Sequence, residues 1–403
     1  MQATAAFDDT SGSRFAEYVR RGLRLLLQQV QETPGVLAEE VREQALALLN
    51  LSLPVDSVWP QARDLLLTSA PKMEQAGLRD EWFPFLQAGL RQSQQMADHL
   101  TIAELHLQLG LLHRLHSDFD ESARCLLLAL NEFTSGQEDT GQARTLNQLA
   151  YLNWQTHRYD EAVRCADQAL LLLPPDDLER GMSLSALGLV AIDQGNWQRA
   201  EALHREALAL RTAHADQRRM AWSLQNLGYA LRGQGKYSEA IDCYERAITY
   251  LEQVHDPAHA AVVRMNLGIA HSLAGDSGAA LVAYAAAAAT FRQTHDQHNL
   301  AKTLTNRGLE YAQLKEWPQA QNCFAASAAL HEQLGDLPLR LNALDGLALA
   351  YQGQQQLAEA ETCLRLALEE LPKIAGTAMY DYLTKTLPVH LEEVQRAAKA
   401  GAS

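Results

Sequence analysis

Long apolar runs, aromatic residues and positive charge are all scarce in this chain of 403 residues. No stretch of about 18 apolar residues occurs, so we expect no membrane-spanning helix. Lysine and arginine total 34 against 49 acidic residues, and the net charge of −15 argues against nucleic acid and anionic membranes as partners. The N-terminal segment MQATAAFDDTSGS has neither the basic start nor the apolar core of a secretory signal. The composition therefore predicts a cytoplasmic protein.

Sequence motifs of the common enzyme classes are missing as well. The chain has no phosphate loop, no glycine-rich dinucleotide turn, no nucleophile elbow and no closely spaced cysteine pair for zinc. We therefore predict no catalytic residues, no cofactor, no metal site and no enzymatic activity. A catalytic cluster assembled from several distant segments is the alternative that motif searching does not detect.

The chain does contain a repeat, which is clearest in WSLQNLGYALRGQGKYSEAIDCYERA at 222–247. We number the repeat so that Leu227 is position 7 and Gly228 is position 8. Position 8 recurs every 40 residues, with one step of 38, at Gly110, Ala150, Gly188, Gly228, Gly268, Gly308 and Ala348. Position 20 is always small and is occupied by Ser122, Ala162, Ala200, Ala240, Ala280, Ala320 and Ala360. Small residues at two fixed points let two amphipathic helices approach closely, so each repeat is predicted to be a pair of helices.

The residues Leu227-Gly228, Gly235, Tyr237, Ala240, Tyr244 and Ala247 resemble the tetratricopeptide repeat (TPR) pattern. With the 40-residue period and the Asn-Leu-Gly motifs, the chain is similar to kinesin light chains, Pins-type polarity scaffolds and the TPR arms of bacterial signalling regulators. The resemblance implies an all-α fold, a right-handed TPR superhelical solenoid of antiparallel helix pairs with helical caps at both ends. It also implies that the first helix of each pair lines the concave face.

The segments on either side of the clear repeats lack the pattern or carry it weakly. We divide the chain into a flexible tail at 1–12, an N-terminal helical hairpin or cap at 13–60, a degenerate repeat at 61–102, seven repeats at 103–376 and C-terminal capping helices at 377–403.

Local signals give the expected helix ends in these flanking segments. Ser13 would cap the first helix and Thr33-Pro34-Gly35 would end it. Pro71 and Pro84 are expected to interrupt the helices of the degenerate repeat. At the C-terminal end we expect two helices, near 377–386 and 389–399.

Four aspartates and five cysteines also follow the period. Each aspartate precedes a predicted first helix and can cap its free N–H groups; these are Asp216, Asp256, Asp296 and Asp336. The cysteines all occupy position 23 and are Cys125, Cys165, Cys243, Cys323 and Cys363. Equivalent points on stacked helical layers lie at least about 9 Å apart, which is too far for a disulfide, so we expect buried reduced thiols. Arg307 stands at position 7, where the other repeats have leucine.

The histidines are the residues that come nearest to a metal motif. His106, His113 and His116 could lie on one face of a helix as ligands. His113 falls at position 11, which is a core position, and His116 lies near the turn, so we favour packing and turn roles. His255, His259, His295 and His298 flank the capping aspartates, and we interpret them as loop residues, with a weak metal or pH site as the alternative.

The candidate binding site is the concave face of the first helices, at positions 2, 5, 6, 9, 12 and 13. Asn226, Asn266 and Asn306 share position 6, and an amide offers both a donor and an acceptor to a peptide backbone. Asparagines at this position hold peptide backbones in the resembled families. Large aromatic side chains and cations complete the predicted peptide site: Tyr151, Trp154, Trp222, Tyr229, Arg144, Arg232 and Lys302. The alternative for the asparagines and aromatics is packing between repeats.

The preferred function is therefore a non-enzymatic adaptor or scaffold that binds an extended peptide segment of a partner protein. The second hypothesis is a peptide-sensing bacterial regulator that acts on a protein target through its N-terminal helices. Self-association, with the N-terminal tail or C-terminal helices in a groove, is a further possibility. The first two hypotheses differ in whether ligand binding tightens the superhelix.

Overall fold

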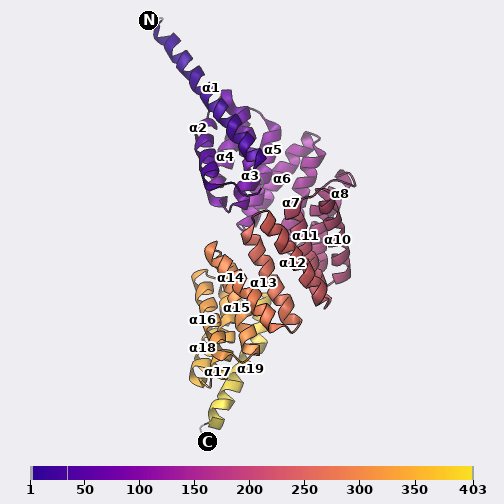
Figure 1. Cartoon of the computed structure of the whole chain (residues 1–403), viewed down its shortest axis with the longest axis vertical. Coiled ribbons are helices and arrows are strands. Elements are labelled where there is room, and N and C mark those ends of the chain that lie inside the picture. Colours follow the sequence, from indigo (N-terminus) through magenta and orange to yellow (C-terminus); the bar gives the residue numbers. More distant parts are fainter. Residues whose placement is uncertain (1–2, 34, 402–403) are drawn as a thin grey trace. The chain divides into compact units, whose positions relative to one another are not determined.

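The computed structural model describes residues 3–33 and 35–401, and these residues form helices and no strand (Figure 1). The N-terminal helices are α1 (Ala3–Glu32), α2 (Glu39–Ser52), the 3₁₀ helix η1 (Asp56–Val58), α3 (Trp59–Gln75) and α4 (Arg79–Gln95). The next are α5 (His99–Leu115), α6 (Phe119–Ser135), α7 (Asp139–Gln155), α8 (Tyr159–Leu172), α9 (Arg180–Asp193), α10 (Trp197–Ala213), α11 (Gln217–Gly233) and α12 (Tyr237–Gln253). The last are α13 (Pro257–Leu273), α14 (Ser277–Gln293), α15 (Gln297–Gln313), α16 (Trp317–Gln333), α17 (Leu337–Gly353), α18 (Leu357–Glu370), η2 (Leu371–Ile374) and α19 (Ala378–Gly401).

The chain divides into two compact units, which we describe separately. Unit 1 comprises Met1–Ala230 and Tyr250–Asp256, and unit 2 comprises Leu231–Thr249 and Pro257–Ser403. Each unit is built from antiparallel helix pairs in which a helix contacts the next helix along the chain. The predicted all-α TPR solenoid is confirmed. Within the described residues, no helix combines the length and apolar character that crossing a membrane requires.

Helices and loops of constant length produce the 40-residue period. Most repeat helices have 17 residues, and three-residue loops separate them, so two helices and two loops make one period. Each three-residue loop contains one residue in the left-handed region, either a glycine such as Gly235 (φ 76°) or another residue such as His255 (φ 54°) or His295 (φ 56°), whereas the longer loop 173–179 between α8 and α9 contains none. The loop role predicted for His255 and His295 is therefore confirmed, whereas His259 and His298 lie in the first turns of α13 and α15.

Position 8 is small because the side chain at position 24 lies against it. A Cβ atom on Gly268 would lie 2.5 Å from the ring of Tyr284, and one on Gly308 would lie 2.9 Å from the ring of Phe324. In the third repeat, Gly188 lies under the imidazole of His204 in the same way. Any side chain at these glycines would separate the two helices of the pair.

The capping aspartates act as predicted where their bonds are described. Each of the side chains of Asp216, Asp296 and Asp336 accepts a hydrogen bond from the backbone N–H group of the residue three positions later. The distances are 3.0, 3.0 and 3.2 Å. Asp256 is buried and accepts a bond of 2.9 Å from the Arg218 side chain. Of the position-23 thiols, Cys125, Cys243 and Cys323 are buried, and Cys165 and Cys363 are half-buried.

Several predicted helix ends are wrong. The segment predicted as a tail is helical from Ala3, so α1 begins ten residues before Ser13; the single Gly12 costs only about 1 kcal/mol in a helix. The predicted tail, turn and C-terminal cap also included some residues that lie outside the described ones. These are residues 1 and 2, Pro34, and residues 402 and 403.

The prolines also fail to end helices. Pro71 and Pro84 lie inside α3 and α4, and Pro388 lies inside α19, which is one helix where we predicted two. All three prolines are exposed, and the buried residues on either side keep helical spacing, as Leu383, Leu387 and Val394 do in α19. The packed face outweighs the loss of one backbone hydrogen bond on the solvent side.

Candidate functional site

First helices of successive repeats lie side by side in both units. In unit 1, α7 contacts both α5 and α9, and in unit 2, α15 contacts both α13 and α17. Positions 2, 5, 6, 9, 12 and 13 of these helices form what we call the first-helix face. All ten predicted peptide-binding residues belong to this face. Their neighbours differ between the two units.

In unit 1, the first-helix face is linked by polar contacts between repeats. Arg144 on α7 forms an ion pair of 2.7 Å with Glu104 on α5. The Trp154 Nε1–H donates a 2.8 Å hydrogen bond to Asp193 at the end of α9. Arg114 donates to the side chains of Gln148 and Gln155 at 3.3 and 3.0 Å. These contacts join each first helix to the next one.

The aromatic residues of unit 1 are also in contact with neighbours. The Tyr151 ring lies edge-on to Trp154 at 6.4 Å between centroids, and the Arg114 guanidinium lies over it at 5.7 Å. Burial raises the pKa of Tyr151. The Arg218 guanidinium lies 4.9 Å from the Trp222 ring centroid, in the range of a cation–π contact.

Tyr229 keeps the largest open surface among the predicted aromatic residues. It is 39% exposed, and its ring centroid lies 6.5 Å from that of Trp197. The aromatic side chains predicted as ligand anchors are therefore all in contact with neighbouring side chains, and Tyr229 is the most exposed of them. Binding of a peptide by these residues stays a prediction.

The position-6 asparagines have a different environment. Asn226 lies in unit 1, and Asn266 and Asn306 lie in unit 2 on the adjacent helices α13 and α15. All three are half-buried, and within residues 3–33 and 35–401 no side-chain hydrogen bond engages any of them. Their amide atoms have no hydrogen-bond partner and yet are not among the buried unpaired polar atoms of the described residues, so the amides reach solvent.

The two cations predicted for this face in the second unit are both half-buried. Lys302 lies one helical turn before Asn306 on α15. Arg232 lies near Tyr284: burial and Glu310 raise the pKa of this tyrosine, and the positive charge of Arg232 acts in the opposite direction. Arg307, the exception at position 7, donates a 2.9 Å hydrogen bond to the Tyr311 hydroxyl.

The histidines do not assemble as the helical spacing would allow. His116 pairs with Asp80 at 3.3 Å, and the Nδ1 atom of His113 lies 3.0 Å from the Asp118 carboxylate. Burial lowers the pKa of His106. The three rings therefore have separate partners or surroundings.

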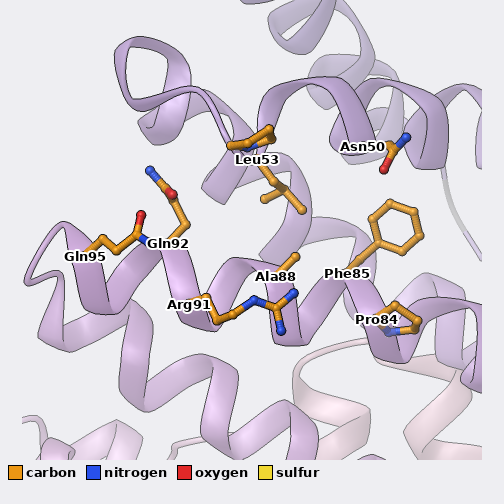
Figure 2. Close-up of a pocket in the computed structure, with 9 residues that line it drawn as sticks. Asn50, Leu53, Pro84, Phe85, Ala88, Arg91, Gln92 and Gln95 are labelled. Carbon is orange, nitrogen blue, oxygen red and sulfur yellow. The ribbon is translucent and has the colours of Figure 1, made fainter.

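Sequence analysis missed a pocket in the N-terminal part of unit 1. Its volume is about 530 Å³, and it lies between the end of α2 and one side of α4. Figure 2 shows Asn50 and Leu53 facing Phe85, Ala88 and Arg91 across it. Pro54, Pro84, Gln92 and Gln95 complete the lining. The sequence carries no local signal for this pocket, because its lining comes from two segments about 30 residues apart.

Comparison with known proteins places these helix pairs in a family. Residues 141–271 match the MalT-like TPR region, and residues 299–370 match the tetratricopeptide repeat. No curated protein sequence is significantly similar to the chain.

Three solved structures share the fold. The signal-transduction ATPase PH0952 from Pyrococcus horikoshii, a STAND protein with a TPR sensor, matches with a TM-score of 0.64 and 13% identity over 93% of this chain and 59% of its own length. A Rap protein complexed with competence and sporulation factor matches with a TM-score of 0.54 and 14% identity over 83% of this chain and 99% of its own. The apo form of RapI matches with a TM-score of 0.51 and 15% identity over 68% and 99%.

These low identities support the fold alone, and the sequence matches identify its repeats. The helix pairs, their small residues at positions 8 and 20 and the two family matches show that the chain is a tetratricopeptide-repeat protein.

Proposed function

We propose that the chain is a non-enzymatic scaffold that holds an extended peptide segment of a partner protein on the first-helix face of α13 and α15. The observation that supports this proposal is the state of Asn266 and Asn306. They occupy the same position on adjacent helices, and no described residue takes up their hydrogen-bonding groups. A side-chain amide matches the donor and acceptor of a peptide backbone.

The spacing of the helices suits an extended ligand. Packed helices lie about 8 to 10 Å apart. A polyproline II peptide advances about 3.1 Å per residue and repeats every three residues, so equivalent backbone groups recur about every 9 Å. Asn266 and Asn306 can then bond to equivalent groups of one peptide, and they would recognise its backbone rather than its sequence.

Lys302 adds a charge preference to this face. It lies one turn from Asn306, is half-buried, and has no ion pair with the described residues. An acidic side chain or a C-terminal carboxylate on the peptide would form an ion pair with the Lys302 ammonium group.

The test begins with selection of binders from a phage-displayed library of random 12-residue peptides on the intact chain. Affinities of the selected peptides are then measured by fluorescence anisotropy. Replacing both Asn266 and Asn306 by alanine removes up to four hydrogen bonds and should weaken binding about 30-fold or more. The matched control replaces Asn131 and Asn322, which are exposed asparagines on the second helices α6 and α16. Equal affinity in both double variants would contradict the proposal.

Asn226 belongs to unit 1, so its contribution needs a separate variant. Asn226→Ala should weaken the same peptides only if they extend beyond the α13–α15 face. The predicted cytoplasmic location, the absence of nucleic-acid and membrane partners, and self-association rest on composition and stay predictions.

A second candidate function, peptide-sensing regulation of a protein target, has one observation of its own. The Rap protein complexed with competence and sporulation factor matches over 83% of this chain, which is more than the seven repeats occupy. In this chain the loop at Gly35 lies against the end of α12: a Cβ at Gly35 would be 2.8 Å from the Val254 carbonyl oxygen. The loop between α1 and α2 thus lies against the loop after α12, more than 200 residues away, where a ligand could influence it.

Small-angle scattering distinguishes the two functions. With the selected peptides, a regulator should become more compact and a simple scaffold should keep its radius of gyration. A radius that no bound peptide changes would remove the regulatory alternative.

A further inference from the structure

Three potential metal ligands meet between α5 and α6 in unit 1. A ring nitrogen of His113, a carboxylate oxygen of Glu121 and the Cys125 sulfur all lie within 4.8 Å of one another. The thiol is 4% exposed, the His113 side chain is 17% exposed, and Glu121 borders the solvent. We propose that His113, Glu121 and Cys125 form a binding site for a divalent transition metal of the zinc type.

The donor set suits such an ion. Zinc binds thiolate at about 2.3 Å and nitrogen or carboxylate oxygen at about 2.0 to 2.1 Å, which puts the three tetrahedral ligands about 3.3 to 3.6 Å apart. The observed limit of 4.8 Å requires only rotamer adjustments to reach that separation. The thiol proton is released to solvent on binding, and a water molecule would take the fourth position.

Neighbouring side chains already orient two of the ligands. The Asp118 carboxylate lies 3.0 Å from Nδ1 of His113, and metal-binding histidines commonly have such a carboxylate on their second nitrogen. The Phe83 ring contacts the imidazole edge-on, with centroids 5.0 Å apart. Arg124 holds one carboxylate oxygen of Glu121 at 2.8 Å from its Nε, which leaves the other oxygen for a metal.

The other repeats show what is special about the first. The three ligands occupy positions 11, 19 and 23. The second repeat has Asn153, Glu161 and Cys165 at these positions, and the Asn153 amide lies 3.8 Å from the Cys165 sulfur. The fold thus brings position 11 to position 23 in both repeats, and among the seven repeats only the first has histidine, glutamate and cysteine together.

The experiment titrates the full chain, stripped of metal with EDTA and kept reduced without thiols, with Co²⁺. We expect one equivalent to bind and to give thiolate-to-cobalt charge-transfer absorption that Zn²⁺ abolishes. Cys125→Ser should remove this absorption, and the matched control Cys165→Ser should retain it. Absence of the absorption in the unmodified chain, or its equal loss in both variants, would overturn the proposal.

Exchanging residues between the repeats introduces only side chains that the fold already holds at position 11. His113→Asn gives the first repeat the combination found in the second, and it should weaken Co²⁺ binding at least about tenfold. Asn153→His completes the ligand set of the second repeat and should raise the stoichiometry from one to two. A stoichiometry that stays at one, with unchanged circular dichroism, would contradict the geometric argument. This site is remote in sequence from α13 and α15, so its failure would leave the peptide proposal untouched.

Discussion

The first-helix faces of the two units differ although the repeat is the same. In unit 1, Arg144 and Trp154 reach across to Glu104 and Asp193 of neighbouring repeats. In unit 2, Asn266 and Asn306 contact no described hydrogen-bonding partner. The partner decides as much as the length of the side chain: arginine, glutamate and tryptophan reach across packed helices, and Asn147 on α7 also does so because Ser183 on α9 donates a 2.6 Å hydrogen bond to it. The position-6 amides of Asn266 and Asn306 lack such a partner among the described residues and are left for a ligand.

The cores of the two units also differ in how many polar side chains they bury. Position 31 is apolar in five repeats, and its exceptions are Arg211 in unit 1 and His331 in unit 2. Arg211 is 1% exposed and donates to the Gly181 carbonyl at 2.9 Å and to the Ser223 hydroxyl at 2.5 Å. Position 24 holds His204 in unit 1, where the aromatic residues Tyr284 and Phe324 occupy it in unit 2. Unit 1 therefore contains more buried polar groups that the fold must satisfy.

The largest effect should come from Arg211→Ala. The variant loses charge-assisted hydrogen bonds between α9, α10 and α11 and leaves a cavity, so we expect a loss of about 3 kcal/mol in the free energy of unfolding. Urea unfolding followed by circular dichroism measures it, and hydrogen exchange should accelerate in α10. The exposed Arg199 on the same helix supplies the control, since Arg199→Ala should change stability by less than about 0.5 kcal/mol. Similar losses in both variants would mean that the buried guanidinium does not link these repeats.

The second largest effect should be a dependence of the stability of unit 1 on pH. Burial, together with the smaller effect of the nearby Arg211 charge, lowers the pKa of His204 to about 3. Below about pH 6.5 the unfolded chain binds a proton that the folded chain excludes, so stability falls as the pH falls. At pH 5 this cost should be about 2 kcal/mol relative to pH 7.5.

His204→Phe installs the side chain that the sixth repeat has at this position and should remove that part of the acid sensitivity. The measurement compares urea unfolding of both proteins at the two pH values. The exposed His295 provides a control, because His295→Gln should keep the pH dependence of the unmodified chain. If His204→Phe keeps it as well, the buried imidazole is not its source.

The smallest effect concerns Trp154. Trp154→Phe keeps the ring and loses the hydrogen bond to Asp193, which should cost about 1 kcal/mol or less. Asp193→Ala should cost a similar amount, and the double variant should cost less than the sum of the two. If Trp154 is a packing residue, selected peptides should bind Trp154→Phe as well as they bind the unmodified chain. Weaker peptide binding would instead mean that Trp154 contacts the ligand, and that the first-helix faces of both units bind peptide.

The repeated part of the fold was predictable because its signals are local and recur. Small residues at positions 8 and 20 and aspartates before the first helices mark the helix pairs directly. The N-terminal helices were predicted less well, because the cost of Pro71 or Pro84 in a helix depends on which side faces solvent. That information comes from tertiary packing and is absent from the sequence rule.

The repeat numbering assigned the predicted site residues to the first-helix face, but it did not predict the residues that they contact. Arg144 and Glu104 share position 2 and lie one period apart, so this pair could have been deduced from the repeat. The cluster of His113, Glu121 and Cys125 has spacings of eight and four across a turn, which matches no metal motif. Only the close packing of two helices brings these three residues together.

The equal three-residue loops have a consequence for how such a chain can change length. Both the loop before α15 and the loop before α17 end in an aspartate that caps the following helix. Removing residues 297–336 would join Asp296 directly to Leu337 and recreate the same turn. Genes for such proteins can therefore lose or duplicate whole modules without disturbing the junctions, and each step would shorten or extend the row of asparagines by one.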